Sequence, residues 1–320
     1  MESVGTWWMW AIFAVVIFGM LMVDIFVCKS GHEHKVSLKE AGIWSAVWVT
    51  TALIFAAGLW LYFNETVSRA EANLVAGEFL TGYVLEKSLA VDNVFVWIMI
   101  FSFFSIPLSL QRRVLLYGIF GAIILRTIMI FAGSWLITQF HWILYLFGVF
   151  LIFTAIRMVT GHDEDKELSQ NKLVLWMQKK WRVTSHLEGE YFFARHNGVL
   201  FVTPLFLALV LVELSDIVFA VDSIPAVFAI TKDPFIVLTS NLFAILGLRA
   251  MYFLLAGVSD RFVLLKYGLA IILGFVGIKM LIVDWLKIPI GISLGFVVFV
   301  LLMTALLSLR FSKTHQIDFK

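Results

Sequence analysis

The stretch EKSLAVDNVF, residues 86–95, places two carboxylates, Glu86 and Asp92, in a segment that otherwise consists mostly of apolar side chains. The stretch DIVFAVDSIP, residues 216–225, repeats the arrangement, with two acids again separated by five residues. A charged side chain at the centre of a membrane-spanning helix costs about 2.5–3.5 kcal/mol on insertion scales and usually marks a functional path. Both stretches therefore indicate a polar site within a membrane protein.

The composition of the whole chain points to the membrane. The 320 residues are 61% hydrophobic and 14% charged, against about 45–50% and about 25% in soluble proteins. Apolar runs long enough to cross a bilayer core of about 30 Å recur along the sequence. We predict an all-α, polytopic membrane protein with about nine transmembrane helices, at residues 7–27, 40–63, 78–104, 114–138, 142–160, 198–230, 235–257, 263–285 and 290–310.

The sixth predicted span is too long for a simple crossing, and it contains Pro204 and Pro225. Proline removes a backbone donor and clashes with the preceding turn, so we expect this helix to be kinked or interrupted.

Basic residues set the expected orientation. Most lysines and arginines fall after odd-numbered spans, whereas the loops on the other side contain only Arg69, Lys232 and Lys287. Since basic residues favour the cytoplasmic side, we expect the N-terminus outside and the C-terminus in the cytoplasm.

The two acidic stretches belong to a longer repeat. Glu86 aligns with Asp216, and Asp92 with Asp222; AIILRTIMIFAG at 122–133 is similar to AILGLRAMYFLLAG at 244–257, which pairs Arg126 with Arg249. YLFGVFLIFTAIRM, 145–158, similarly matches YGLAIILGFVGIKM, 267–280. Each unit holds three spans, so the second would enter the membrane from the opposite side, as in the inverted repeats of secondary transporters.

The repeat suggests five parts of the chain. We expect two peripheral helices at 1–77, a first three-helix repeat at 78–160 and a second, inverted one at 198–285. Residues 161–197 would form a cytoplasmic loop, either a solvated connector or one with a short amphipathic helix. Residues 286–320 would form the last helix and a cytoplasmic tail.

The polar residues within the predicted spans divide into oxygen ligands and bases. The candidate metal ligands are Glu86, Asp92, Asn93, Glu213, Asp216 and Asp222. The possible counter-charges are Lys87, Arg126 and Arg249. In one interpretation these acids and bases only pair to hold helices together. Five acids against three bases leave two carboxylates unmatched, however, and a divalent cation or two protons would balance them.

The ligand types restrict the metal. An all-oxygen site without His or Cys suits Mg²⁺, Ca²⁺ or Mn²⁺ better than Zn²⁺ or Cu⁺. Residues six apart on a continuous helix point about 120° apart, so one ion contacts both acids of a stretch only if that helix unwinds. Alternatively, each site draws on both repeats, with Asp92 and Asp222 meeting near the axis that relates them. We expect Asp24, near the end of the first span, to reach headgroup water.

The quoted motifs resemble a known family. EKSLAVDNVF, VELSDIVFAVDSIPA (212–226) and TSNLFAILGLRAMYFLL (239–255) resemble the TerC family of integral membrane proteins, which belongs with the LysE-type exporters. The resemblance covers essentially the whole chain. It implies inverted three-helix repeats, a place in the bacterial inner membrane, and an association with manganese export and tellurite resistance. The family's acidic motifs fall on Glu86, Asp92 and Asn93, and on Glu213, Asp216 and Asp222.

We therefore expect a transporter that exports a divalent metal, foremost Mn²⁺, with protons as the possible coupling ion. Its partners would be the cation, protons and the lipid bilayer, with no nucleic acid and no prosthetic group. Two alternatives stay open: a membrane-bound redox modulator, and a tellurite-resistance protein that handles an oxyanion through Arg126 and Arg249. The redox alternative and an enzyme are less expected, because Cys28 is the single cysteine and no Rossmann glycine pattern occurs.

Overall fold

A computed structural model describes residues 3–29, 38–140, 142–160, 176, 180–184, 186–196, 198–256, 264–286 and 288–315. The helices are α1 (Trp7–Lys29), α2 (Leu38–Thr66), α3 (Arg69–Phe103), α4 (Leu108–Gln139), α5 (Ile143–Thr160), α7 (Pro204–Phe228), α8 (Pro234–Leu246), α9 (Leu248–Ala256), α10 (Leu265–Leu281) and α11 (Ile290–His315). The two strands are β1 (Phe193–His196) and β2 (Val199–Val202). This confirms the prediction of an α-helical, polytopic membrane protein.

Within the described ranges, six helices are long and apolar enough to cross a membrane, and seven if α8 and α9 form one span. The structure therefore supports fewer than the nine spans predicted. Two further predicted spans correspond to α3 and α10. Helix α3 carries several charged side chains and α10 is 17 residues long, and neither is among these six helices.

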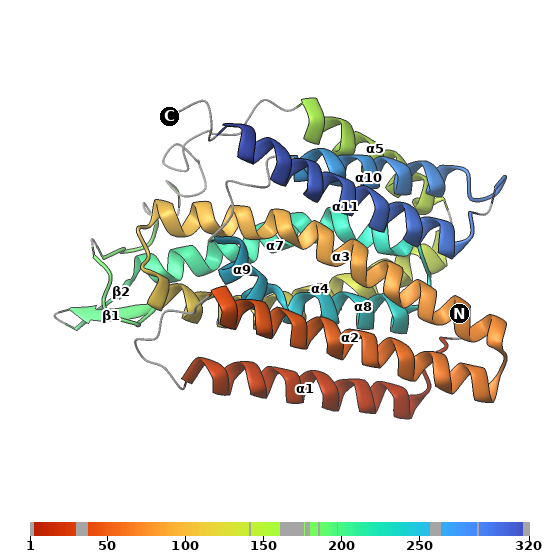
Figure 1. Cartoon of the computed structure of the whole chain (residues 1–320). Helices are drawn as coiled ribbons and strands as arrows, with labels where there is room; N and C mark the ends of the chain where they lie inside the picture. Colours follow the sequence, from red (N-terminus) through yellow and green to blue (C-terminus); the bar gives the residue numbers. More distant parts are fainter. Residues whose placement is uncertain are drawn as a thin grey trace.

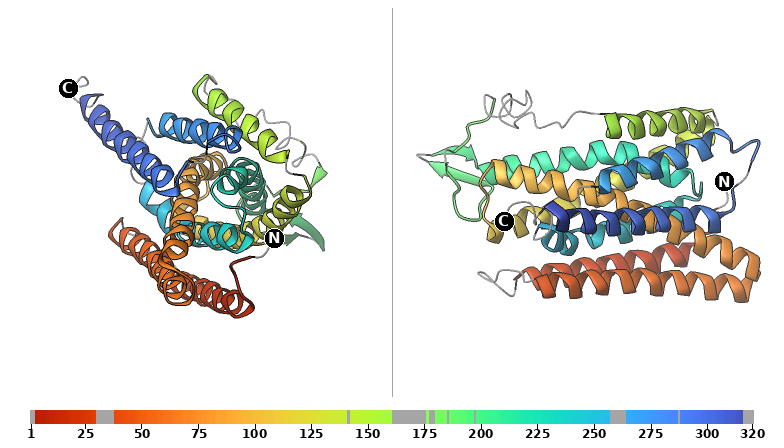
Figure 2. Two further views of the ribbon diagram at one scale, coloured as in Figure 1. Left: turned by 90° about the vertical axis from the view of Figure 1, so that its right-hand side faces the viewer. Right: turned by 45° about the horizontal axis from the view of Figure 1, so that its top comes forward.

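The helices lie in three groups across the bundle (Figure 1). Helices α1 and α2 lie along one flank, and α5, α10 and α11 along the opposite one; α3, α4, α7, α8 and α9 lie between them. The view along the bundle in Figure 2 places α3 and α7 at its centre. The acid-bearing stretches of the sequence therefore lie on the two central helices.

The predicted interruption of the sixth span is wrong. Helix α7 is continuous from Pro204 to Phe228, with Pro204 in its first turn, where the missing N–H costs nothing, and Pro225 close to its end. Residues 199–202 form β2 instead of helix, in an antiparallel hairpin with β1. The break lies in the next span, where α8 and α9 meet at Gly247 with a bend of 41°.

The described part of the predicted loop 161–197 consists of residues 176, 180–184 and 186–196. It contributes β1 and a bridge between Val183 and Val202, and the predicted amphipathic helix lies mostly outside the described residues. The ring of Phe193 lies 4.7 Å from that of Phe206, which seats the hairpin on the first turn of α7.

Local signals fix the starts of the central helices. The Ser68 hydroxyl accepts from the Glu71 N–H at 3.2 Å and caps α3. Asp233 accepts from the Phe235 N–H at 2.8 Å and caps α8. The same carboxylate also accepts from the Val4 N–H at 2.6 Å, which ties the segment before α1 to the start of α8.

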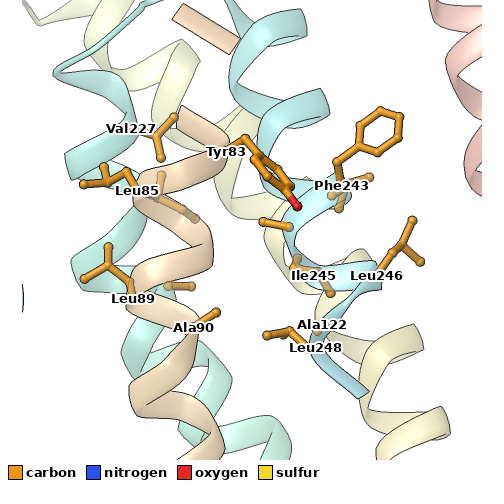
Figure 3. Packing of buried hydrophobic residues seen from close by; sticks show 14 of the residues in the cluster. Tyr83, Leu85, Leu89, Ala90, Ala122, Val227, Phe243, Ile245, Leu246 and Leu248 are labelled. Atoms are coloured by element: carbon orange, nitrogen blue, oxygen red, sulfur yellow. The ribbon is translucent and has the colours of Figure 1, made fainter. Parts of the chain in front are cut away.

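Apolar packing surrounds the polar centre. Figure 3 shows Tyr83, Leu85 and Leu89 of α3 among buried residues of α7 and α8, including Val227 and Phe243. The rings of Phe79 and Phe243 make an edge-to-face contact with centroids 5.9 Å apart. This packing keeps water from the central helices and so strengthens electrostatic interactions between them.

Candidate functional site

The centre of the bundle contains a buried ion cluster around Arg126 of α4. The guanidinium of Arg126 contacts the carboxylate of Asp216 of α7 through two bonds, Nη2 to Oδ1 at 2.8 Å and Nε to Oδ2 at 3.1 Å. It also forms an ion pair with Glu86 of α3. Each of the three side chains is about 1% exposed. Three helices thus converge on one guanidinium.

Neutral polar side chains complete the cluster. The Arg126 Nη1 lies 3.5 Å from the hydroxyl of Ser223 and 3.4 Å from Oδ1 of Asn241 on α8. The Ser223 hydroxyl lies 3.4 Å from Glu86 Oε1, and the amide nitrogen of Asn93 lies 3.5 Å from Asp216 Oδ1. These contacts are at the long limit for hydrogen bonds, so the two bonds to Asp216 and the ion pair with Glu86 are what hold Arg126 in place.

The cluster is not balanced in charge or in hydrogen bonding. Two carboxylates face one guanidinium, so in their ionised forms they carry one negative charge more than Arg126 neutralises. Glu86 Oε2 and Asn93 Oδ1 accept no hydrogen bond from the described residues. Buried acceptors without donors cost free energy, so such a place favours a ligand that brings positive charge or protons.

A cavity of about 660 Å³ adjoins the cluster. Residues of α3, α4, α5, α7 and α10 line it, among them Glu86, Asn93, Arg126, Asp222, Arg157 and Lys266. The Thr154 hydroxyl donates to Asp222 Oδ1 at 3.3 Å on the α5 side of this space. The cavity therefore brings together acids from two segments of the chain, Glu86 and Asp222, that are 136 positions apart.

Glu213 lies one turn before Asp216 on α7, within electrostatic reach of it. Its carboxylate fills the space beside Gly121 of α4, where any side chain would meet it. Its Oε2 is buried and has no hydrogen-bond partner among the described residues. Glu213 thus adds a third acid beside the cluster, at the α4–α7 contact.

Two predicted site residues, Lys87 and Asp92, are not seen in this cluster. Lys87 donates to the backbone carbonyl of Ala244 at 3.1 Å, and its ammonium fills the space beside Gly247 at the break between α8 and α9. Asp92 lies within α3, but its side chain lies outside the described residues. The expected meeting of Asp92 with Asp222 stays a prediction.

Arg249 does not share the environment of Arg126. Its Nη2 lies 2.5 Å from Oδ1 of Asp24 on α1, and both residues line a small space near Trp48. Asp24 is 2% exposed, so the expectation that it reaches headgroup water is wrong in this structure. A partner on a helix outside the repeat gave no signal in the sequence.

Glu78 of α3 was also absent from the predicted set. Its carboxylate accepts from the Thr231 hydroxyl and lies within electrostatic reach of Lys279 on α10. Glu78 is the first residue of the predicted span 78–104, a position where an acid can lie at the membrane surface and so gives no signal of a buried contact.

The metal assignment itself stays a prediction. Among the residues that the structure describes, no group of three or more His, Cys, Asp or Glu side chains is arranged to hold a metal ion. The two carboxylates that do meet, Glu86 and Asp216, are bridged by Arg126.

Comparison with known proteins gives the family. The profile of the integral membrane protein TerC family matches residues 72–316. The chain belongs to the TerC family. It is 58% identical over 316 residues, 99% of this chain and 98% of the relative, to Alx of Escherichia coli K12, which is described as a candidate membrane-bound redox modulator. A relative from Salmonella typhi with the same description is 56% identical over all of this chain and 99% of its own length.

More distant matches keep the full length. An uncharacterised membrane protein of Myxococcus xanthus is 44% identical over 99% of this chain and 97% of its own length. No solved structure matches the chain. TerC membership confirms the family that the acidic motifs indicated.

Proposed function

We propose that this TerC protein exports a divalent metal ion, foremost Mn²⁺, from the cytoplasm through the cavity between α3, α5 and α7. The observation that carries the proposal is the joint presence of Glu86 and Asp222 in one cavity of about 660 Å³, beside the amide of Asn93. Carboxylate and amide oxygens are the ligands that Mn²⁺ and other hard cations prefer.

Helix pairing supports an inverted repeat in this proposal. Helix α3 packs against α8 and α4 against α7, while α5 packs against α10 and α3 against α7. Exchange of α3–α4–α5 with α7–α8/α9–α10 leaves this set of pairs unchanged. A transporter built in this way can open its central site to either side by rocking one unit against the other.

Export against the membrane potential needs a coupling ion. Moving one charge through 100 mV costs about 2.3 kcal/mol, so a divalent ion against about 150 mV costs about 7 kcal/mol. We propose that entering protons supply this free energy by exchanging with the metal on the buried carboxylates. The basic loops favour an orientation with the C-terminus in the cytoplasm.

The proposal is tested in bacterial cells that lack other manganese exporters and that express this protein in the inner membrane. Wild type should lower the manganese content of cells grown in Mn²⁺, and Asp92→Asn and Asp222→Asn should not. Asp284→Asn is a matched control, because Asp284 pairs with Tyr145 outside the cavity. If wild type leaves cell manganese unchanged at verified expression, the proposal is wrong.

The description of the relatives favours a second candidate, a redox modulator. The sequence offers this function little chemistry, since Cys28 is the single cysteine. Loss of all function in Cys28→Ser would support this candidate. A Cys28→Ser protein with the full function of wild type would exclude it.

The cavity lining favours a third candidate, an oxyanion-handling protein linked to tellurite resistance. Arg126, Arg157 and Lys266 all line the cavity, whereas Arg249 lies with Asp24 elsewhere. In this candidate function, Arg126→Gln would abolish tellurite resistance while Asp222→Asn would leave it intact.

A further inference from the structure

Arg126 takes the place between Glu86 and Asp216 that a bound cation would need. We propose that Arg126 is a tethered cation which fills this place when no metal is bound, and that it must move away before a divalent ion binds both carboxylates. This inference rests on the proposed function and adds to it a built-in competitor for the transported ion.

The contacts of Arg126 are of a kind that a divalent cation can replace. Its guanidinium bridges the two acids, while its contacts to Ser223 and Asn241, at 3.5 and 3.4 Å, are weak. Much of the Coulomb energy of a buried charge pair is offset by the cost of removing both charges from water, so the net stabilisation is small. A divalent ion with twice the charge can therefore compete with the guanidinium for the same two carboxylates.

Unused ligand atoms lie at the same place. Glu86 Oε2 and Asn93 Oδ1 belong to side chains about 1% exposed, and both accept nothing from the described residues. The one positive charge of Arg126 also leaves one negative charge uncancelled. Two carboxylates with one further amide oxygen would bind a divalent ion with full charge balance, while K⁺ would leave the same imbalance as Arg126.

The cavity gives the guanidinium room to move. Arg126 itself lines the space of about 660 Å³, as do Val218 and Phe219 of α7. Arg249, its counterpart in the sequence repeat, lies beside a space of only about 20 Å³ and pairs with Asp24 of α1. The two arginines therefore differ in function: Arg249 attaches α1 to α9, and Arg126 guards the central site.

The test is equilibrium binding of Mn²⁺ to the purified full-length protein in detergent, measured by calorimetry and by metal-induced shifts in melting temperature. Arg126→Gln should bind Mn²⁺ tighter than wild type by about tenfold or more, because a repelling charge has been removed from the site. Its melting temperature should fall without metal and recover with Mn²⁺ but not with K⁺. Arg249→Gln, the matched control, should bind Mn²⁺ as wild type does.

A second variant covers the case in which Arg126→Gln does not accumulate. Lysine keeps the charge but has no planar fork to bridge two carboxylates. Arg126→Lys should therefore bind Mn²⁺ tighter than wild type, by a smaller factor. If the variant that folds binds Mn²⁺ no tighter than wild type, the inference is wrong.

The outcomes separate this inference from the proposed function. If wild type exports Mn²⁺ but the Arg126 variants bind Mn²⁺ with the affinity of wild type, the tethered-cation inference is wrong and the exporter proposal stands. If wild type does not export Mn²⁺ but Arg126→Gln binds Mn²⁺ tighter than wild type, the exporter proposal is wrong and the tethered-cation inference stands.

Discussion

Lys87 Nζ lies 3.1 Å from the backbone carbonyl oxygen of Ala244, so an ammonium from α3 reaches the carbonyl end of α8 at the break before α9. The last carbonyls of a helix carry partial negative charge and lack intrahelical donors. A cation placed there stabilises the end of α8 at this break.

Lys87→Met should therefore loosen the α8–α9 junction. We expect a loss of about 1 kcal/mol or more of stability, because the buried carbonyl loses a charged donor. The measurement is thermal unfolding of the purified protein in detergent. Ser88→Ala is the neighbouring control, since the Ser88 hydroxyl donates within its own helix to Val84, and it should unfold close to wild type. Equal melting temperatures for Lys87→Met and wild type would contradict this role.

Asp24→Asn should weaken the attachment of α1 to the bundle. The substitution removes the carboxylate charge 2.5 Å from Arg249 Nη2, and breaking a buried ion pair costs about 3–5 kcal/mol. We expect lower thermal stability with unchanged Mn²⁺ affinity, because Asp24 does not line the central cavity. A loss of Mn²⁺ binding at unchanged stability would instead place Asp24 in the transport path.

Gly121→Ala tests Glu213 without removing its charge. A methyl group at Gly121 would overlap the Glu213 carboxylate. The flexible Glu213 side chain would therefore have to move away from its present position. If Glu213 takes part in transport, the variant should lose Mn²⁺ export while it accumulates in the membrane normally. Gly42→Ala, where the added methyl meets nothing within 4 Å, is the control. Normal export by Gly121→Ala would argue for a purely structural Glu213.

Tyr252→Phe tests the packing of α9 against α4. The Tyr252 hydroxyl donates to Gln111 Oε1 at 2.6 Å, and both residues are buried. Removing the hydroxyl leaves the amide oxygen without that donor, which costs about 1–3 kcal/mol. Tyr191→Phe, at an exposed position, should cost much less in the same thermal unfolding experiment. If Tyr252→Phe unfolds at the same temperature as wild type, the hydrogen bond to Gln111 contributes little to stability.

Much of the fold follows from the sequence because it depends on local patterns. Hydropathy gives the membrane class and the places of most helices, and the spacing of acids in residues 86–95 and 216–225 points to the central pair α3 and α7. The role of Arg126 as a counter-charge was predictable, since arginines within membrane helices need acidic partners.

What the sequence could not give depends on how the helices rotate and pack. Proline predicted a break in the span with Pro225, but α7 continues through Pro225 to Phe228, and the break occurs at Gly247. The partner of Arg249 was equally hidden, because Asp24 lies 225 positions away on a helix outside the repeat. Such contacts follow from tertiary packing and leave no local pattern.

The central claim is that carboxylates on α3 and α7 carry a divalent cation across the membrane. The most direct measurement is Mn²⁺ uptake into inside-out membrane vesicles, with wild type compared to Glu86→Gln and Asp222→Asn at matched protein levels. The account predicts uptake by wild type that depends on a proton gradient, and none above background by either variant. Equal uptake by wild type, both variants and empty vesicles would contradict it.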